Sequence, residues 1–477
     1  MTTPPMNVEL RKQLREIEEA IVSRAPEHDI DPTLVRVAQL LEVLGDPQRA
    51  YPVIHVTGTN GKTSTTRIIE RLLLELGLRT GRFTSPHLHD IRERIVLSGE
   101  PVSPERFIEA YEDLAPLLAL VEERSLAAGT GRLSFFEILV ALAYAIFADA
   151  PVDVAVVEVG LGGTWDATNV ADGAVAVVLP IAVDHERYLG AEVELIAGEK
   201  SGIIKPDAIA ISAPQEPVAV EVLRERAAEV GVPIVFDIGA TGDDFSDDSS
   251  DAPAQAPVIG SGGIAVLARD VAVGGQMLTL RGLAGDYPDV FLPLHGEHQA
   301  HNALVALAAV EAFVGGGEQP LDRDVVRAAF AAVTSPGRLE IVRRSPTVLV
   351  DAAHNPAGIA SLVAALEDAF VFTRMIGLFA CMEDKDVEGM LEQLEPVLEE
   401  IVITRTTSMR AMDPARLADL AREYFGEHRV HLVPDLPDAL DRAAELADTE
   451  GGVGGGVVAT GSVFVAAEVR ALLGAGS

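Results

Sequence analysis

The sequence predicts an α/β protein with two domains, each built on a mostly parallel β-sheet. Three observations support this fold class. Short apolar runs typical of buried strands alternate with amphipathic helical patterns, and this alternation is typical of βαβ units. The alternation occurs in two separate blocks of the chain. The length of 477 residues also exceeds that of most single domains.

The first block begins with a helical region and then alternates strands with helices. Apolar residues recur at three- and four-residue spacing between Ile17 and Leu44, which predicts helices. A short apolar strand at 51–56 is followed by a glycine-containing turn and by a helix predicted over 64–76. Further strands are predicted at 152–157, 174–179 and 209–213. We therefore expect a parallel-rich sheet in an N-terminal domain spanning residues 1–325.

The second block starts near residue 338 and has the same character. Strands are predicted at 347–351, 375–380, 400–404 and 456–461, with helical patterns between them. We expect a smaller, Rossmann-like α/β domain over 338–477. A linker is expected at about 314–337, where GGGEQP and TSPG interrupt the patterns. Ligands commonly bind in the cleft between two such domains.

One segment of the N-terminal domain differs from its surroundings. Residues 236–263 include a stretch with six aspartates and no basic residue. Such a composition cannot bury enough apolar surface to form a core. We therefore expect an acidic, solvated insertion.

Charge and cysteine content exclude several classes of partner. The chain has 37 Lys+Arg against 73 Asp+Glu, a net charge of −36, which argues against nucleic acid and anionic membranes because both are polyanions. The single cysteine, Cys381, cannot form an internal disulfide, and the N-terminal segment has no apolar signal core. The apolar stretch at 138–148 is too short to span a bilayer. We expect a cytoplasmic monomer with small-molecule partners.

The strongest local motif is a phosphate-binding loop, GTNGKTS at 58–64, between a predicted strand and a predicted helix. Backbone N–H groups of such a loop form an anion nest, and the helix N-terminus adds partial positive charge. Lys62 can reach β- and γ-phosphate oxygens, and the hydroxyl of Thr63 or Ser64 can orient Mg²⁺ or phosphate. The N-terminal domain is thus predicted to be P-loop NTPase-like. The loop is a variant, because Val56 replaces the first glycine of the GxxxxGK[ST] pattern.

Three further side chains are candidates for metal binding or catalysis. Glu158 ends a predicted strand, where a carboxylate faces the ligand-binding edge of a parallel sheet and can hold Mg²⁺. His185 closes the next strand, and a lone histidine there fits either a metal ligand or an ordinary hydrogen-bonded residue. Lys200 lies in a weakly helical stretch, where a solvent-facing lysine is an equal alternative.

An ordered set of motifs spans residues 50 to 465, nearly the whole chain. The set comprises GTNGKTST, SPHL at 85–88, ERI at 93–95, SFFE at 134–137, EVGLGGTWDATN at 158–169, DH at 184–185, EKSGI at 199–203, HQxxN at 298–302, GRLE at 337–340, DAAHNP at 351–356 and TGS at 460–462. In this order the motifs resemble those of the folylpolyglutamate synthase and dihydrofolate synthase family, within the Mur ligase superfamily. They favour its bifunctional bacterial type.

The resemblance implies an ATP site, a metal site and a catalytic set. The phosphates of ATP would be bound by Asn60, Gly61, Lys62, Thr63 and Ser64. Its adenine and ribose would be bound by Asn302, Arg338 and Asp351. Two Mg²⁺ ions are expected, with ligands Ser85, Glu158, His185 and a carbamylated Lys200. The catalytic set would be Lys62, Lys200, His185 and Arg338. Carbamylation is chemically coherent at a lysine, because CO₂ adds to a neutral amine that arginine does not offer.

The resemblance also implies where the two other substrates bind. A pterin would contact Phe135, Phe136, Glu137 and Asp166, with Pro32 and Thr33 closing the pocket. Aromatic faces stack on a pterin and carboxylates accept from its amino edge, although core packing would equally explain the two phenylalanines. Incoming L-glutamate would be held by His354 and Ser462. Many relatives have RLDATN where this chain has TWDATN, so Trp165 would reshape the edge of the pocket.

The implied activity is that of an ATP-dependent carbon–nitrogen ligase. It would join L-glutamate to dihydropteroate to make dihydrofolate, and add further γ-linked glutamates to folates, through an acyl phosphate. A folylpolyglutamate synthase with that single activity is an alternative, and so is a P-loop NTPase regulator that makes no amide. A peptidoglycan Mur ligase is disfavoured, because the 57 residues before Gly58 are too few for a UDP-sugar-binding domain. A non-catalytic interaction protein is disfavoured by the intact catalytic set.

Overall fold

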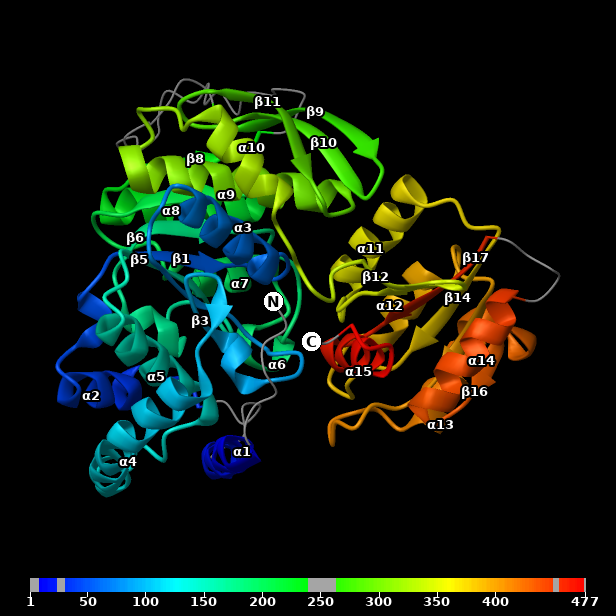
Figure 1. The fold of residues 1–477 in the computed structure, drawn as a ribbon, viewed down its shortest axis with the longest axis horizontal. Coiled ribbons are helices and arrows are strands. Elements are labelled where there is room, and N and C mark those ends of the chain that lie inside the picture. The colour runs from blue at the N-terminus through cyan, green and yellow to red at the C-terminus, as the bar shows by residue number, and fades with distance from the viewer. Residues whose placement is uncertain (1–7, 24–30, 239–262, 449–453, 476–477) are drawn as a thin grey trace.

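The computed structural model describes residues 8–23, 31–238, 263–448 and 454–475, and it forms two α/β units that lie side by side (Figure 1). Each unit contains a sheet of mostly parallel strands, so the predicted fold class is confirmed. Most of the predicted acidic insertion, residues 239–262, falls outside the described residues. Within the described ranges, no helix combines the length and the apolar character that a membrane crossing requires. The monomeric state and the cytoplasmic location stay predictions.

The first unit contains the helices α1 (Val8–Val22), α2 (Val35–Val43), α3 (Lys62–Glu75), α4 (Pro104–Ala127), α5 (Phe135–Asp149), α6 (Glu186–Leu189), α7 (Val193–Ser201), α8 (Pro217–Val230), α9 (Glu297–Gly315) and α10 (Arg323–Ala331). Its strands are β1 (Val53–Thr57), β2 (Thr80–Phe83), β3 (Ile95–Leu97), β4 (Glu100–Pro101), β5 (Val154–Glu158), β6 (Gly173–Val178), β7 (Ile209–Ser212), β8 (Ile234–Phe236), β9 (Ala265–Ala272), β10 (Gly275–Arg281) and β11 (Asp286–Leu292). A 3₁₀ helix, η3 (Ala167–Val170), follows β5.

The main sheet of the first unit places three loops at one edge. Its strand order is β4-β3-β2-β5-β1-β6-β7-β8, and β1 pairs in parallel with both β5 and β6. Helices α3 and α9 cover one face, and α2, α4 and α5 cover the other (Figure 1). Strands β1 and β5 are therefore buried throughout and are mostly apolar, with His55 and Thr57 the polar residues of β1 and Glu158 that of β5. The carboxyl ends of β1, β5 and β6 carry the phosphate-binding loop, Glu158 and the loop before His185.

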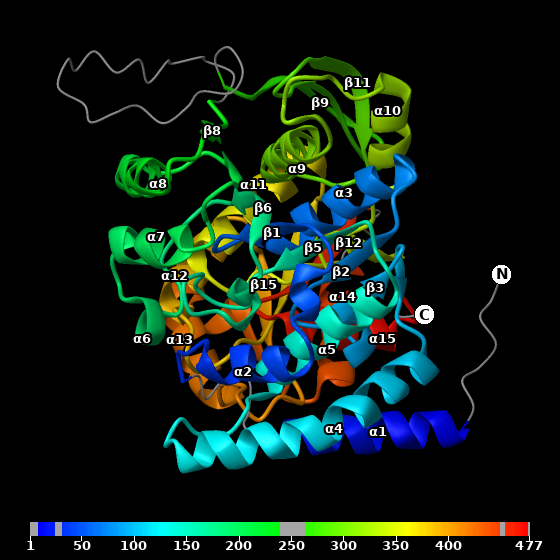
Figure 2. The same cartoon turned by 90° about the vertical axis from the view of Figure 1, so that its left-hand side faces the viewer.

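Helix α1 lies outside the sheet layers. It runs alongside the long helix α4 at the base of the unit (Figure 2). Its buried side chains Leu14, Ile17 and Ile21 recur at three- and four-residue spacing, which gives one apolar face. This face joins the same hydrophobic cluster as α2, α4 and α5.

The last part of the first unit contains a small antiparallel sheet, β11-β10-β9, that the sequence did not predict. Its strands β9 and β10 pack on α9 and β11 packs on α10, and residues such as Leu278, Leu280 and Val290 join the same hydrophobic cluster. The interval predicted as a linker, 314–337, holds helix α10, which packs on α3 and β11. Since α10 belongs to the first unit, the connection between the units is the short stretch 332–339. The domain boundaries themselves stay a prediction.

The second unit contains β12 (Glu340–Arg344), β13 (Thr347–Val350), α11 (Pro356–Ala369), β14 (Arg374–Phe379), α12 (Val387–Leu394), β15 (Glu400–Ile403), α13 (Pro414–Phe425), β16 (Val430–Leu432), α14 (Leu436–Asp448), β17 (Gly455–Thr460) and α15 (Val463–Leu472). Its strand order is β12-β13-β17-β14-β15-β16, in which β12 is antiparallel to β13. Helices α11, α12 and α13 cover one face, and α14 and α15 cover the other.

Candidate active site

A cavity of about 1670 Å³ lies between the two units. Its wall combines the carboxyl ends of β1, β5 and β6 with the segments 351–358 and 382–386 of the second unit. Every site residue predicted from the sequence lines this cavity except Phe135. Residues as far apart in the sequence as Pro32 and Ser462 therefore meet in one cavity.

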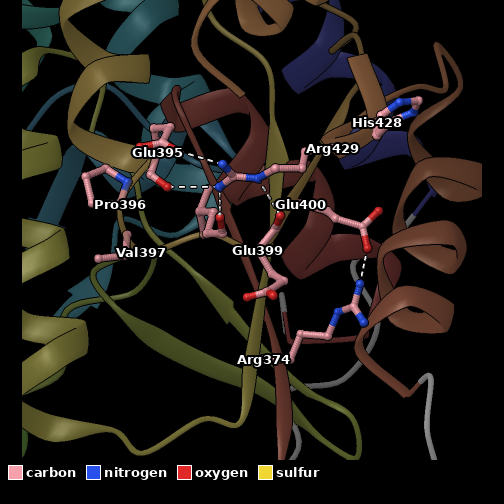
Figure 3. Close-up of a pocket in the computed structure, with 9 residues that line it drawn as sticks. Arg374, Glu395, Pro396, Val397, Glu399, Glu400, His428 and Arg429 are labelled. Atoms are coloured by element: carbon pink, nitrogen blue, oxygen red, sulfur yellow. Dashed lines mark hydrogen bonds and ion pairs between the residues drawn. The ribbon is translucent and has the colours of Figure 1, made fainter. Parts of the chain in front are cut away.

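A second cavity, of about 720 Å³, lies in the second unit and contains none of the predicted site residues (Figure 3). Its charged groups already have partners in the protein. The Arg429 guanidinium donates to the Glu395 carboxylate and to the carbonyls of Leu398 and Glu399, and Arg374 pairs with Glu400 (Figure 3). We therefore place the site in the cavity between the units.

The phosphate-binding loop contains a left-handed backbone conformation that requires glycine. Gly61 has φ +89°, and a Cβ at this position would lie 2.7 Å from Oδ1 of Asn302, so only glycine fits beside that amide. Helix α3 begins at the next residue, Lys62, and directs its free N–H groups toward the loop. Lys62 Nζ donates to the carbonyls of Gly58 and Thr59 at 2.9 and 3.1 Å. The ammonium group is therefore held against the phosphate-binding loop.

Lys200 is buried rather than solvent-facing, being 3% exposed. Helix α7 carries it to the Gly58 carbonyl, to which its Nζ donates at 3.0 Å. Burial, together with the nearby Lys62 cation, lowers the pKa of Lys200 to about 7. A large fraction of this side chain is therefore the neutral amine near neutral pH. The alternative of an ordinary surface lysine is wrong.

Glu158, Ser85 and His185 line the same cavity as the start of α3. The Glu158 carboxylate accepts from the Thr63 hydroxyl at 3.0 and 3.1 Å and from the backbone N–H of Ser85. Burial raises the pKa of Glu158, while the Lys62 ammonium opposes the rise. Burial lowers the pKa of His185 to about 4, so its imidazole is neutral and can act as a ligand. Within the described ranges, no three His, Cys, Asp or Glu side chains form a metal site by themselves.

Asp184 lines the cavity and joins the two units, a role that the sequence did not reveal. Its carboxylate accepts from Lys385 Nζ at 2.6 Å and from Asn355 Nδ2 at 2.9 Å, both in the second unit. Nε2 of His354 lies 3.6 Å away. Asn355 also exchanges hydrogen bonds of 3.2 Å with Asn60 of the phosphate-binding loop. One carboxylate thus connects the phosphate-binding edge to the second unit.

Phe136 and Phe135 are neighbours in sequence but have different surroundings. Phe136 lines the cavity and packs against Phe83, with ring centroids 5.7 Å apart, and against the backbone of Gly160. Phe135 is buried away from the cavity, beneath the Arg94 guanidinium at 5.0 Å from its ring centroid. Phe135 is therefore a core residue in this structure, and its predicted contact with a pterin is not supported.

Glu137 has a basic partner that the sequence did not reveal. The Arg36 guanidinium donates to its carboxylate at 3.1 and 3.2 Å, and both side chains are buried. Arg36 also donates to Asp31 at 2.6 Å, which fixes the loop that brings Pro32 and Thr33 to the cavity wall. Arg36 and Glu137 are 101 positions apart, and no pattern in the sequence connects them.

Asp166 and Trp165 form another part of the wall. Asp166 accepts from the backbone N–H of Thr168 at 3.0 Å and of Leu161 at 2.9 Å, which fixes its carboxylate at the start of η3. Burial raises the pKa of Asp166, while the Thr168 hydroxyl and these backbone groups oppose the rise. Trp165 lines the cavity beside it.

Arg338 and Asp351 lie where the second unit begins. Arg338 lines the cavity and donates to the Gly337 carbonyl at 3.2 Å. The Asp351 carboxylate accepts from the backbone N–H of Leu339 and of Ala353, both at 2.8 Å. Asp351 therefore fixes the turn that carries Arg338. Asn302, across the cavity, is oriented by the Gln299 side chain at 3.1 Å.

His354 and Ser462 face the cavity from the second unit. The His354 imidazole contacts the Ala352 carbonyl through Nδ1 at 2.9 Å. Burial, with the nearby Lys385 cation, lowers the pKa of His354 to about 4. Ser462 caps α15, because its hydroxyl accepts from the N–H of Val465 at 3.1 Å. The N-terminus of α15 therefore points toward the cavity and favours an anionic ligand there.

Comparison with known proteins agrees with this arrangement. The Mur ligase middle domain matches residues 56–310, and the Mur ligase, glutamate ligase domain matches residues 337–463. The chain is 48% identical to a dihydrofolate synthase/folylpolyglutamate synthase of Mycobacterium tuberculosis, covering 97% of this chain and 94% of the relative. It is 28% identical to the Bacillus subtilis protein of the same name, with 92% and 95% covered.

Solved structures show the same likeness. The Mycobacterium tuberculosis folylpolyglutamate synthase complexed with ADP and AMPPCP has a TM-score of 0.88 and 46% identity, over 98% of this chain and 99% of that one. Escherichia coli FolC in complex with DHPP and ADP has a TM-score of 0.78 and 26% identity, over 98% of each chain. As its motifs predicted, the chain belongs to the dihydrofolate synthase/folylpolyglutamate synthase family of the Mur ligase superfamily.

Proposed function

We propose that this chain is an ATP-dependent ligase that joins L-glutamate to dihydropteroate, making dihydrofolate, and adds γ-linked glutamates to folates. The observation that carries the proposal is the cavity between the units. It combines a phosphate-binding loop, a buried carboxylate and a buried lysine from the first unit with His354 and the α15 N-terminus from the second. The relatives named above carry both activities in their names.

The donor set fits Mg²⁺ bound together with nucleotide phosphates. Ser85 and Glu158 offer oxygen atoms, and His185 offers a neutral imidazole, all on the cavity wall. These side chains do not form a closed cage, and Mg²⁺ usually binds through one or two carboxylates plus substrate phosphates. When bound, the ion offsets the negative charge of the phosphoryl group. A carbamylated Lys200 would supply a further carboxylate-like ligand at Gly58.

In the first step, the acceptor carboxylate attacks the γ-phosphorus of ATP in line and gives an acyl phosphate and ADP. Lys62 now donates to two loop carbonyls, and phosphate oxygens would replace these as acceptors. Arg338 faces the same space from the connection between the units. Both cations stabilise charge that spreads over the transferred phosphoryl group.

In the second step, the ammonium group of L-glutamate loses a proton to solvent, and the resulting amine attacks the acyl carbon; the tetrahedral intermediate then loses a second proton and expels phosphate. The N-terminus of α15 and Ser462 would hold the glutamate carboxylates. His354 is neutral at neutral pH, so its Nε2 can accept a hydrogen bond from the ammonium group. Much of the rate acceleration would come from bringing the acyl phosphate and the amine together across the cavity.

The acceptor wall favours dihydropteroate as one substrate. Phe136 presents an aromatic face and Asp166 a carboxylate to the same cavity, which suits stacking and an amino-pyrimidine edge. The Escherichia coli structure was solved with DHPP and ADP. A synthase that only extends folates is the second candidate, because Trp165 gives this wall a different edge from that of the many relatives that have RLDATN.

The decisive measurement is ADP release with dihydropteroate, Mg²⁺ and ATP, with and without L-glutamate. We expect ADP only when glutamate is present, together with dihydrofolate detected by mass spectrometry. Tetrahydrofolate in place of dihydropteroate separates the two candidates, because the bifunctional enzyme uses both acceptors. Folded protein that releases no glutamate-dependent ADP with either acceptor would contradict the proposal.

A further inference from the structure

We propose that His55, Thr168 and Tyr144 form a buried relay that orients Asp166 toward the acceptor. Residues that do not touch the substrate would then determine how well a pterin acceptor binds. The inference rests on the proposed function, since it assigns Asp166 to the acceptor site. Its three members lie on different elements, β1, η3 and α5.

Thr168 holds one oxygen of the Asp166 carboxylate twice. Both its backbone N–H, at 3.0 Å, and its hydroxyl, at 2.5 Å, donate to Oδ1 of Asp166. Leu161 N–H donates to Oδ2 at 2.9 Å. Asp166 is 3% exposed and lines the cavity. The backbone N–H of Gly160 also donates to this carboxylate, so the carboxylate cannot rotate freely.

The Thr168 hydroxyl links the Asp166 carboxylate to His55. A hydroxyl has one hydrogen, and this one is used on Asp166, so the Thr168 oxygen must accept from His55 Nε2 at 2.9 Å. His55 is therefore the tautomer with its proton on Nε2. Burial and the nearby Lys205 cation lower the pKa of His55 to about 3, so the ring stays neutral. Its Nδ1 is among the buried atoms without a hydrogen-bond partner in the described residues.

Tyr144 fixes Thr168 from the other side. Its hydroxyl donates to the Thr168 carbonyl at 2.7 Å, and both side chains are fully buried. Lys205 donates to the carbonyls of Asn169 and Ala171 at 2.6 and 2.7 Å, which holds the end of η3. The loop that carries Asp166 is thus held by polar groups that belong to the surrounding elements.

The chemical identity of His55 argues for more than packing. It occupies the middle of the central strand β1, where Ile54 and Val56 on either side are apolar and buried. A buried imidazole with one nitrogen unpaired is destabilising compared with an apolar side chain. The hydrogen bond from His55 Nε2 fixes the Thr168 oxygen, which in turn donates to Asp166, and this function offsets the disadvantage.

The test compares Thr168→Val, which keeps the shape and removes the hydroxyl, with Thr168→Ser, which keeps the hydroxyl. We expect Thr168→Val to raise the KM for dihydropteroate about tenfold, as for loss of a hydrogen bond to a charged group. The KM for ATP and for L-glutamate should stay within about twofold, and Thr168→Ser should restore the wild-type acceptor KM. Trp165 is the only tryptophan and lines the cavity, so its fluorescence reports dihydropteroate binding without turnover.

The relay would be overturned if Thr168→Val changed all three KM values equally. It would also be overturned if the variant left both the KM and the dissociation constant for dihydropteroate unchanged. Should Thr168→Val fail to fold by circular dichroism, Tyr144→Phe tests the same arrangement with its aromatic volume kept. Wild-type protein that neither binds nor uses dihydropteroate would instead refute the proposed function. Wild-type protein that uses it, with Thr168→Val indistinguishable, would refute only the relay.

Discussion

Replacing Lys200 with alanine is expected to lower kcat about 10²- to 10³-fold, while the KM for ATP changes little, as for loss of a group that stabilises transition-state charge. The reason is the position of the amine, buried at the Gly58 carbonyl and close to Lys62. Steady-state ADP release in the presence of glutamate measures the effect. Lys12→Ala is the control, because Lys12 is exposed on α1 and only pairs with Glu16.

A second substitution of Lys200 tests whether this residue acts as a carbamate or as a cation. Lys200→Arg keeps the positive charge but offers no neutral amine, so it should be as inactive as the alanine variant. The pKa of Lys200, lowered to about 7 by burial, means that the reactive amine is depleted as pH falls below 7. Activity should therefore depend more on added bicarbonate at pH 6 than at pH 8. Full activity of Lys200→Arg would refute the carbamate.

Replacing Asp184 with alanine is expected to lower kcat/KM for glutamate about 100-fold, the size of effect seen when one partner of a buried charge pair is removed. Lys385 is nearly buried and would lose its partner at 2.6 Å, and Asn355 would lose its bond of 2.9 Å. The second unit would then lose one of its links to the phosphate-binding edge, while the hydrogen bonds between Asn60 and Asn355 remain. Glutamate titrations at saturating ATP measure the change.

A matched control lies elsewhere in the same interface. Asp368 of α11 pairs with Arg269 of β9 across the two units, but this carboxylate is exposed to solvent. Surface ion pairs contribute about 0–1 kcal/mol, so Asp368→Ala should alter kcat/KM by less than about fivefold. If raised Mg²⁺ restored Asp184→Ala, the carboxylate would act through the metal rather than through docking.

The sequence predicted what depends on local pattern. The run before Gly58 is apolar except for His55 and Thr57, and the run before Glu158 is apolar throughout, so β1 and β5 were identified, and polar residues at their ends mark the binding edge. The cavity residues predicted from motifs, apart from Phe135, lie together. Phe135 and Phe136 differ only in their angle around α5, and packing against Arg94 or Gly160 decides which one faces the cavity.

Other features depend on contacts that no local pattern encodes. Asp184 meets Asn355 and Lys385 across 171 and 201 positions, so its role appears only once both units are folded. The strands β9, β10 and β11 belong to a small sheet with irregular register, and their exposed residues do not alternate strictly with buried ones. The period-two pattern that identifies a strand is therefore weak there.

The packing of α10 on the first unit has a mechanical consequence. Because that helix is fixed to α3 and β11, the covalent connection between the units is only a few residues long, and Arg338 is one of them. If one unit rotated against the other, the direction in which the Arg338 guanidinium points would change. Any change in the angle between the units therefore also moves a positive charge relative to the phosphate-binding loop. A change in the angle between the units would thus alter the electric potential at a bound nucleotide. The phosphates of that nucleotide would in turn favour one angle over others.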